Sequence, residues 1–202
     1  MPPQRKEEIE IKLRVAYPAA LRRHLRLLGA RLLRRVFERN AVFDTPGGLF
    51  YHRGRLLRLR SVTPGAGKRR DRPLPGLITF KGPSKSSRPY KVREEVELNL
   101  PDAHRAETLL RAVGLVPAFR YEKWRTSFRI PALPTLHVYF DETPIGCFIE
   151  LEGSPRAIDR AARLLGYHPA DYLTSSYRAL YLIYCRRRGI QPRHMVFPRQ
   201  KK

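Results

Sequence analysis

Charged and apolar residues alternate in several short segments, and this alternation constrains the fold more than any other feature of the chain. In the first segment Glu8, Glu10 and Lys12 alternate with Ile9 and Ile11. Successive residues of a β-strand point to opposite faces of a sheet, so a period of two predicts a strand with one ionic and one apolar face. The same sorting recurs in the segments 55–63, 77–81, 90–98, 119–130 and 147–152.

Two further segments, 34–43 and 136–141, bring the number of predicted strands to eight. Helical periodicity is confined to four segments, which we place at 18–28, 102–113, 154–165 and 175–187. The apolar faces of these helices need a covering surface, and the apolar face of a closed sheet provides one. We therefore predict an α+β fold: a closed eight-stranded antiparallel β-barrel, or tunnel, with its apolar outer face covered by helices and room inside for one small ligand.

The chain length favours a single domain. With 202 residues, 42% of them hydrophobic, the chain can bury one sizeable core, and we place the tunnel domain at residues 1–188. Residues 189–202 are basic and are expected to form a disordered tail. Mobile loops are expected at 64–76 and 82–89. No apolar stretch approaches the roughly 20 residues of a membrane span and the N-terminal segment is charged, so we expect a cytoplasmic protein.

The charge balance narrows the range of partners. Lys and Arg total 41 against 18 acidic residues, a formal charge of +23 that attracts polyanions such as nucleic acid, polyphosphate and nucleotides. An arginine-rich coding bias gives the same excess without any function, so charge alone does not choose among them. Cys147 and Cys185 lack a CxxC spacing, so neither a disulfide framework nor a zinc site is predicted. The histidines show no mutual spacing typical of a site and are assigned no role.

Enclosing the ionic faces would be costly unless their charges are paired or filled by an ion and a ligand of complementary charge. Carboxylates bind Mg²⁺ or Mn²⁺, and Lys and Arg bind phosphate oxygens, so a metal triphosphate meets this requirement. For any single strand, an open sheet whose ionic face meets water is the alternative. An open sheet explains the ionic faces of all the strands together less well. Solvated faces usually mix Thr, Ser and Gln with Lys, whereas these faces are almost wholly Glu, Lys and Arg.

Residues 8–12 read EIEIK, which matches an ExExK motif, and the segments 57–60, 79–82, 92–97, 121–125 and 148–153 follow it in order. In this series the chain resembles the CYTH superfamily, the triphosphate tunnel metalloenzymes, which include class IV adenylate cyclases and thiamine triphosphatases. The resemblance covers residues 7–184. It implies an eight-stranded antiparallel tunnel that binds a triphosphate together with one or two divalent metal ions, Mg²⁺ or Mn²⁺.

The resemblance also implies roles for the ionic residues. Catalytic roles fall to Glu8, Glu10 and Lys12. The implied metal carboxylates are Glu8, Glu10, Glu150 and Glu152, with less certain help from Glu95, Glu97 and Asp141. The implied phosphate-binding residues are Lys12, Arg58, Arg60, Lys81, Arg93, Lys123 and Arg125. For Asp141 and Lys91 a surface charge and a role in the site remain equally open.

The function we predict is metal-dependent hydrolysis of a phosphoanhydride bond in inorganic, thiamine or nucleoside triphosphate. A class IV adenylate cyclase, in which the 3′ hydroxyl of ATP attacks the α-phosphorus and pyrophosphate leaves, would use almost the same charged residues and is the first alternative. A non-catalytic module that binds polyphosphate or RNA 5′ ends is the second, although paired carboxylates repel phosphate unless a metal intervenes. The expected partner is a small-molecule triphosphate; the basic surface allows nucleic acid, which we do not favour. We expect no membrane association and a monomer or homodimer.

Overall fold

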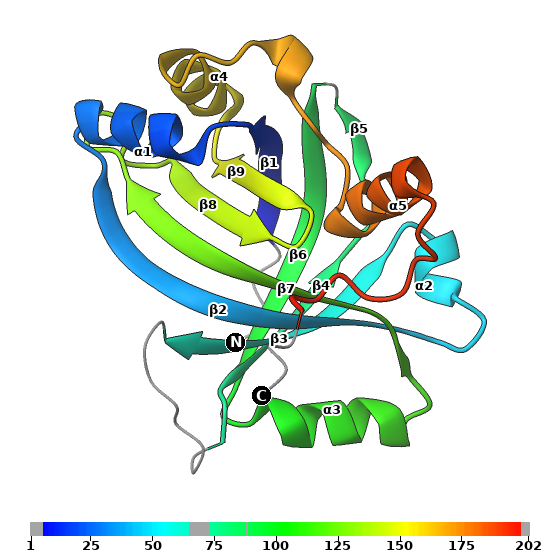
Figure 1. Cartoon of the computed structure of the whole chain (residues 1–202). Coiled ribbons are helices and arrows are strands. Elements are labelled where there is room, and N and C mark those ends of the chain that lie inside the picture. Colours follow the sequence, from blue (N-terminus) through cyan, green and yellow to red (C-terminus); the bar gives the residue numbers. More distant parts are fainter. Residues whose placement is uncertain (1–5, 65–72, 88, 199–202) are drawn as a thin grey trace.

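The computed structural model describes residues 6–64, 73–87 and 89–198, and its strands form one antiparallel sheet closed into a barrel (Figure 1). The order is β1-β9-β8-β7-β2-β3-β4-β6, and pairing of β1 with β6 completes the circle. The predicted closed eight-stranded barrel is therefore confirmed. Its strands are β1 (Lys6–Val15), β2 (Arg31–Asp44), β3 (Leu56–Pro64), β4 (Gly76–Lys81), β6 (Tyr90–Leu100), β7 (Val116–Arg129), β8 (His137–Thr143) and β9 (Gly146–Glu152).

Four helices lie where the sequence predicts them, and a local signal marks the start of each. Pro18 and Pro155 occupy the first turns of their helices, and the side chain of Asp102 accepts hydrogen bonds from the backbone N–H groups of His104 and Arg105. In the described residues no helix is long and apolar enough to cross a bilayer. The four are α1 (Pro18–Leu27), α3 (Ala103–Ala112), α4 (Pro155–Leu164) and α5 (Tyr177–Arg188).

Three short elements were not predicted from the sequence. They are the one-turn helix α2 (Leu49–His52), the 3₁₀ turn Pro169–Asp171 and the three-residue strand β5 (Lys85–Ser87), which pairs with the start of β6 within the expected 82–89 loop. Elements of three or four residues are too short to show a hydrophobic period. The expected 64–76 loop falls largely on residues 65–72, outside the described part.

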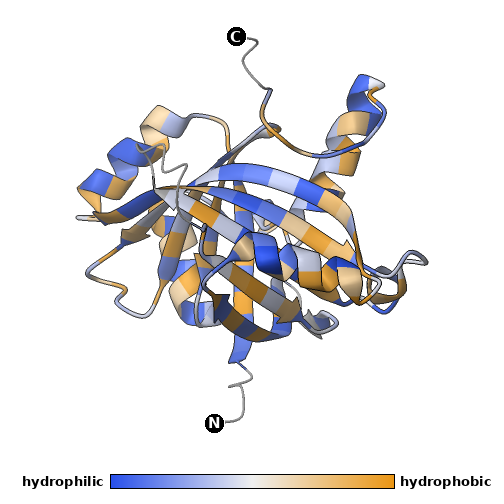
Figure 2. Ribbon diagram, turned by 90° about the horizontal axis from the view of Figure 1, so that it is seen from below, coloured by the Kyte–Doolittle hydropathy of each residue, from blue (hydrophilic) through white to orange (hydrophobic). Residues whose placement is uncertain are grey.

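The barrel is inverted, with apolar side chains outside and ionic side chains inside. Along the strands of Figure 2, hydrophilic and hydrophobic residues alternate. On the outer face, α1 and α4 cover the β1–β9–β8 side, where Leu25 and Ile158 pack into one cluster with Ile11 and Leu13. Helix α3 covers a second cluster on β2 and β3, and α5 covers a third on β7 and β9. The hydrophobic core therefore surrounds the barrel instead of filling it.

The C-terminal segment differs from the expectation of disorder over residues 189–198. It runs back over β7, where the Met195 N–H donates to the Arg120 carbonyl at 3.0 Å and the Glu122 N–H donates to the Met195 carbonyl at 2.9 Å. The Met195 side chain is fully buried beside Phe119 and Tyr121. The basic composition of the segment favoured a prediction of disorder. One buried apolar side chain anchors the segment, and a single residue is too little to change that composition. Residues 199–202 lie outside the described part.

Replacing Met195 with Ala should lower the free energy of unfolding by about 2–5 kcal/mol, the usual cost of truncating a large buried side chain. The matched control is Val196→Ala, because Val196 is 42% exposed and its truncation should change stability by no more than about 0.5 kcal/mol. Urea unfolding of the two variants measures the difference. Equal unfolding midpoints would show that the segment does not pack on the barrel.

Candidate functional site

The interior of the barrel is a cavity of about 500 Å³ lined mainly by ionic side chains. Ten Lys or Arg residues and six glutamates line it, an excess of four positive charges. The acids are confined to one side: all six glutamates lie on the adjacent strands β6, β1 and β9, which also carry four of the cations, whereas every charged lining residue of β7, β2, β3 and β4 is a cation. The six cations on those four strands are Arg34, Arg58, Arg60, Lys81, Lys123 and Arg125.

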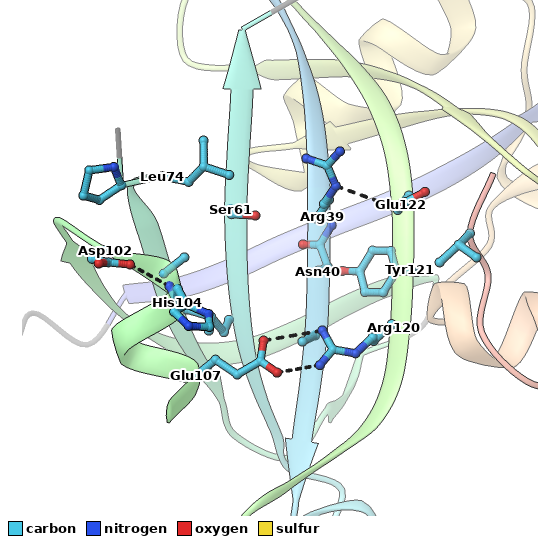
Figure 3. Close-up of a pocket in the computed structure, with 15 residues that line it drawn as sticks. Arg39, Asn40, Ser61, Leu74, Asp102, His104, Glu107, Arg120, Tyr121 and Glu122 are labelled. Carbon is cyan, nitrogen blue, oxygen red and sulfur yellow. Dashed lines mark hydrogen bonds and ion pairs between the residues drawn. The ribbon is translucent and has the colours of Figure 1, made fainter. Parts of the chain in front are cut away.

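A larger pocket, of about 700 Å³, lies on the outer face between α3 and strands β2, β3 and β7 (Figure 3). Its charged side chains are largely matched within the pocket. Arg120 donates to Glu107 at 2.6 Å, and Arg39 lies 3.6 Å from Glu122. Because these pairs leave no comparable excess of one sign, the barrel interior is the better candidate for a site.

Thirteen of the fourteen predicted site residues line the interior cavity, as does Lys91. Most are buried, whereas Glu97 is exposed and Glu152 is partly exposed. Asp141 is the exception, since it is fully buried behind the cavity wall. The strand alternation thus brings the predicted residues together, while the roles assigned to them stay predictions.

The glutamates of β1 are each paired with lysines. Glu8 accepts a hydrogen bond from Lys81, and Glu10 accepts hydrogen bonds from Lys12 and Lys91. Burial alone would raise the pKa of Glu10, but Lys12 and Lys91 outweigh it and hold the pKa below its ordinary value. Burial would lower the pKa of Lys12, but Glu10 and Glu150 raise it. Both groups therefore carry full charge at neutral pH.

Asp141 orients the two cations of β7 that line the cavity. It accepts hydrogen bonds from Lys123 at 2.7 Å and from Arg125 at 2.7 and 2.6 Å, and the Tyr177 hydroxyl donates to it at 2.7 Å. Arg125 also donates to Glu150. A bidentate arginine–carboxylate pair fixes the plane of the guanidinium group, so the position of Arg125 is set before any ligand arrives.

Glu38 on β2 is a member of the site that the sequence analysis missed. It is 2% exposed and lies 3.3 Å from Arg60, 3.7 Å from Lys123 and 3.9 Å from Arg125. Burial raises its pKa, but these cations outweigh burial and hold the pKa below its ordinary value. Glu38 and Asn40 are two residues apart, so they lie on the same face of β2, and this spacing was the sequence signal for a polar inner face. Asn40 accepts a hydrogen bond from Arg60 at 3.0 Å. One acid in the predicted segment 34–43 does not by itself reveal an ionic face.

Two tyrosines, Tyr121 and Tyr177, line the cavity and pack in the apolar cluster covered by α5. Ser176 caps α5 by accepting a hydrogen bond from the Ala179 N–H, which places Tyr177 at the first helical position. The Tyr177 ring centre lies 5.4 Å from the Lys12 ammonium and 4.9 Å from that of Lys123, within cation–π range. The Tyr121 hydroxyl accepts from Arg58 at 3.4 Å. Helix α5 thereby adds a neutral wall to the cationic side of the cavity.

The donor set on β1 and β9 fits a divalent metal ion. Glu8, Glu10, Glu150 and Glu152 supply the carboxylate oxygens that Mg²⁺ and Mn²⁺ prefer. The strand register places Glu10 directly opposite Glu152, and like charges in this position destabilise a sheet unless they are neutralised. Among the described residues, no three His, Cys, Asp or Glu side chains are already arranged as a ligand set. The four glutamates therefore suit a divalent metal ion because of their ligand type, and not because they are already arranged around a metal position.

A closed antiparallel tunnel with segregated interior charges defines the class of fold to which this protein belongs. The CYTH domain family model matches residues 6–177, and the chain belongs to the CYTH domain family. That membership supports triphosphate processing at the level of the family.

Solved structures share this fold at low sequence identity. A candidate adenylate cyclase from Vibrio parahaemolyticus is 21% identical with a TM-score of 0.70 over 88% of this chain and 98% of that one. A protein from Pyrococcus horikoshii is 22% identical with a TM-score of 0.72 over 87% and 98%. A candidate adenylyl cyclase from Hippeastrum is 22% identical with a TM-score of 0.62 over 92% and 97%. No curated protein sequence matches the chain.

Glu38→Gln should lower the free energy of unfolding by about 3–5 kcal/mol at neutral pH, because it removes the charge that compensates three buried cations. The folded-state pKa of Glu38 is lowered, so its stabilising contribution is present above the unfolded-state pKa of about 4.3 and is lost as the pH falls below it. The difference between wild type and variant should therefore shrink below about pH 4. Urea unfolding at a series of pH values measures it.

The matched control for this prediction is Glu142→Gln. Glu142 pairs with Arg22 and Arg35 on the exposed surface, so its loss should cost no more than about 1 kcal/mol. Equal effects of the two substitutions, or a Glu38→Gln effect independent of pH, would contradict the role of Glu38 in compensating the charges of Arg60, Lys123 and Arg125.

Proposed function

We propose that this chain is a metal-dependent triphosphatase that hydrolyses a phosphoanhydride bond of inorganic, thiamine or nucleoside triphosphate. The observation that carries the proposal is the charge distribution in one cavity: its glutamates all lie on β6, β1 and β9, and every charged lining residue of β7, β2, β3 and β4 is a cation. The glutamates suit a metal ion, and the cations suit the phosphate chain. The related Hippeastrum protein is described as having a dominant triphosphatase activity, which agrees with this proposal.

Glu8, Glu10, Glu150 and Glu152 would hold the metal ion, which when bound supplies Lewis-acid polarisation of the phosphate oxygens. Arg58, Lys123 and Arg125 would hold the phosphates through charge-assisted hydrogen bonds. Lys12 stays protonated at neutral pH because Glu10 and Glu150 raise its pKa, so it acts as a cationic contact and not as a base. Positioning and neutralisation of charge are the main catalytic terms expected for phosphoryl transfer.

Binding of the two ligands should be mutually dependent. Glu8 and Glu10 are neutralised by Lys81, Lys12 and Lys91 in the structure. A phosphate chain offers these lysines a replacement counter-ion, and a divalent cation offers one to the glutamates. If only the triphosphate bound, the glutamates would lose their lysine partners, and if only the metal ion bound, the lysines would lose their glutamate partners. The metal ion and the triphosphate are therefore expected to bind together.

Replacing both Glu8 and Glu10 with Gln should lower metal-dependent turnover of tripolyphosphate by about 100-fold or more, a loss comparable to removing a group that stabilises the transition state. Binding of tripolyphosphate without metal should persist or tighten, because two negative charges leave the cavity. The control is Glu7→Gln on the same strand: Glu7 is exposed and pairs with Lys85 outside the cavity. Steady-state phosphate release and calorimetric titration measure the two effects.

Identification of the products separates the candidate functions. Purified protein with Mg²⁺ or Mn²⁺ should release orthophosphate from at least one of tripolyphosphate, ATP and thiamine triphosphate. Cyclic AMP and pyrophosphate from ATP would instead identify an adenylate cyclase. Tight binding of all three compounds with no turnover under either metal would contradict an enzymatic function and favour a binding module.

A further inference from the structure

Two aromatic residues lie in line on the interior face of β8. His137 and Tyr139 both line the cavity, their ring centres are 6.2 Å apart and their planes differ by only 8°. Exposure rises along this face, from the fully buried Asp141 through the half-buried Tyr139 to the exposed His137. Inward-facing residues of a strand are about 7 Å apart, so the three side chains lead stepwise from the buried wall of the cavity to its exposed edge.

Tyr139 connects this aromatic pair to the cations of the site. The guanidinium carbon of Arg125 lies 4.4 Å from the centre of the Tyr139 ring, and Arg125 is itself held by Asp141 and Glu150. A tyrosine phenol, with an ordinary pKa of about 10, is neutral at physiological pH. Tyr139 is therefore an ordered, uncharged surface beside a proposed phosphate-binding residue.

The other described aromatic residues of the cavity are engaged elsewhere. Tyr121 and Tyr177 are buried in the apolar cluster beneath α5, and their hydroxyls contact Arg58 and Asp141. His137 and Tyr139 thus differ from them in position and in accessibility, because they lie toward the open end of the cavity.

We propose that His137 and Tyr139 form a stacking subsite for a planar aromatic group attached to the triphosphate, as in a nucleoside triphosphate or thiamine triphosphate. The proposal rests on the proposed function, which places the phosphates at Arg125 and its neighbours. A substituent that extends from those phosphates toward the mouth passes over Tyr139 and then His137. Aromatic side chains stack on any planar base, so this subsite favours aromatic triphosphates over inorganic tripolyphosphate without reading a particular base.

The test compares kcat and KM for ATP, thiamine triphosphate and tripolyphosphate in the wild type and in His137→Ala. Loss of the stacking contact should raise KM about fivefold or more for at least one aromatic substrate, while KM for tripolyphosphate and kcat for all substrates stay unchanged. The ATP and thiamine triphosphate arms identify which aromatic group the subsite accepts. His137→Phe, which keeps a planar ring and lacks the imidazole nitrogens, should restore the wild-type KM. His104→Ala, an exposed histidine on α3, is the control and should change neither constant.

An equal rise of KM for all three substrates would overturn the subsite, because it would indicate loss of a polar or charge contact to phosphate. Unchanged KM for both aromatic substrates would overturn it as well. If the wild type hydrolyses none of the three compounds, the proposed function fails, and the subsite is then tested by calorimetry: His137→Ala should weaken binding of an aromatic triphosphate and leave tripolyphosphate binding intact. Equal affinities of variant and wild type for every ligand would refute the stacking role.

Discussion

Compensation of buried charge is the constraint on which the rest of this structure depends. An ionic side chain removed from water is costly unless a partner of opposite sign lies close to it. Glu38 and Asp141 supply such partners for Lys123, Arg125 and Arg60 from positions that do not line the cavity. The cations are thereby fixed in place, while the surface they present to the cavity keeps an excess of positive charge.

The inverted arrangement of the barrel follows from this ionic interior. With charged side chains inside, the sheet cannot form its hydrophobic core there, and the apolar rows of the strands must be covered from outside. Helices α1 and α4, α3, and α5 provide this cover in three separate clusters. Closure through β1 and β6 also pairs the strand edges that an open sheet would leave exposed.

Strand β1 pairs with β6 on one side and with β9 on the other, and the two edges differ in how their inward-facing charges are matched. On the β6 side, the register pairs Glu8 with Arg93 and Glu10 with Lys91, so acids face bases. On the β9 side, the register sets Glu10 opposite Glu152. Along the β9 edge Lys12 lies opposite Glu150, so only the Glu10–Glu152 pair sets like charges against each other, and lysines lie beside both of its members. Under the proposed function, a divalent cation held by the carboxylates of β1 and β9 would offset that repulsion.

The sequence by itself determined the strands, their ionic and apolar faces, the four longer helices and thirteen of the residues that line the cavity, because alternation and capping are local properties of the chain. Tertiary structure decided which side chains become neighbours. The local sequence gives Glu38 no partner until the strand register sets it opposite Lys123, and His137 and Tyr139 gain their position only when β8 takes its place in the closed barrel. Met195 is one apolar residue in a basic segment, and only its contact with β7 shows that it is buried. A local pattern predicts the face of the sheet on which a side chain lies, whereas closure of the barrel determines which side chains it contacts.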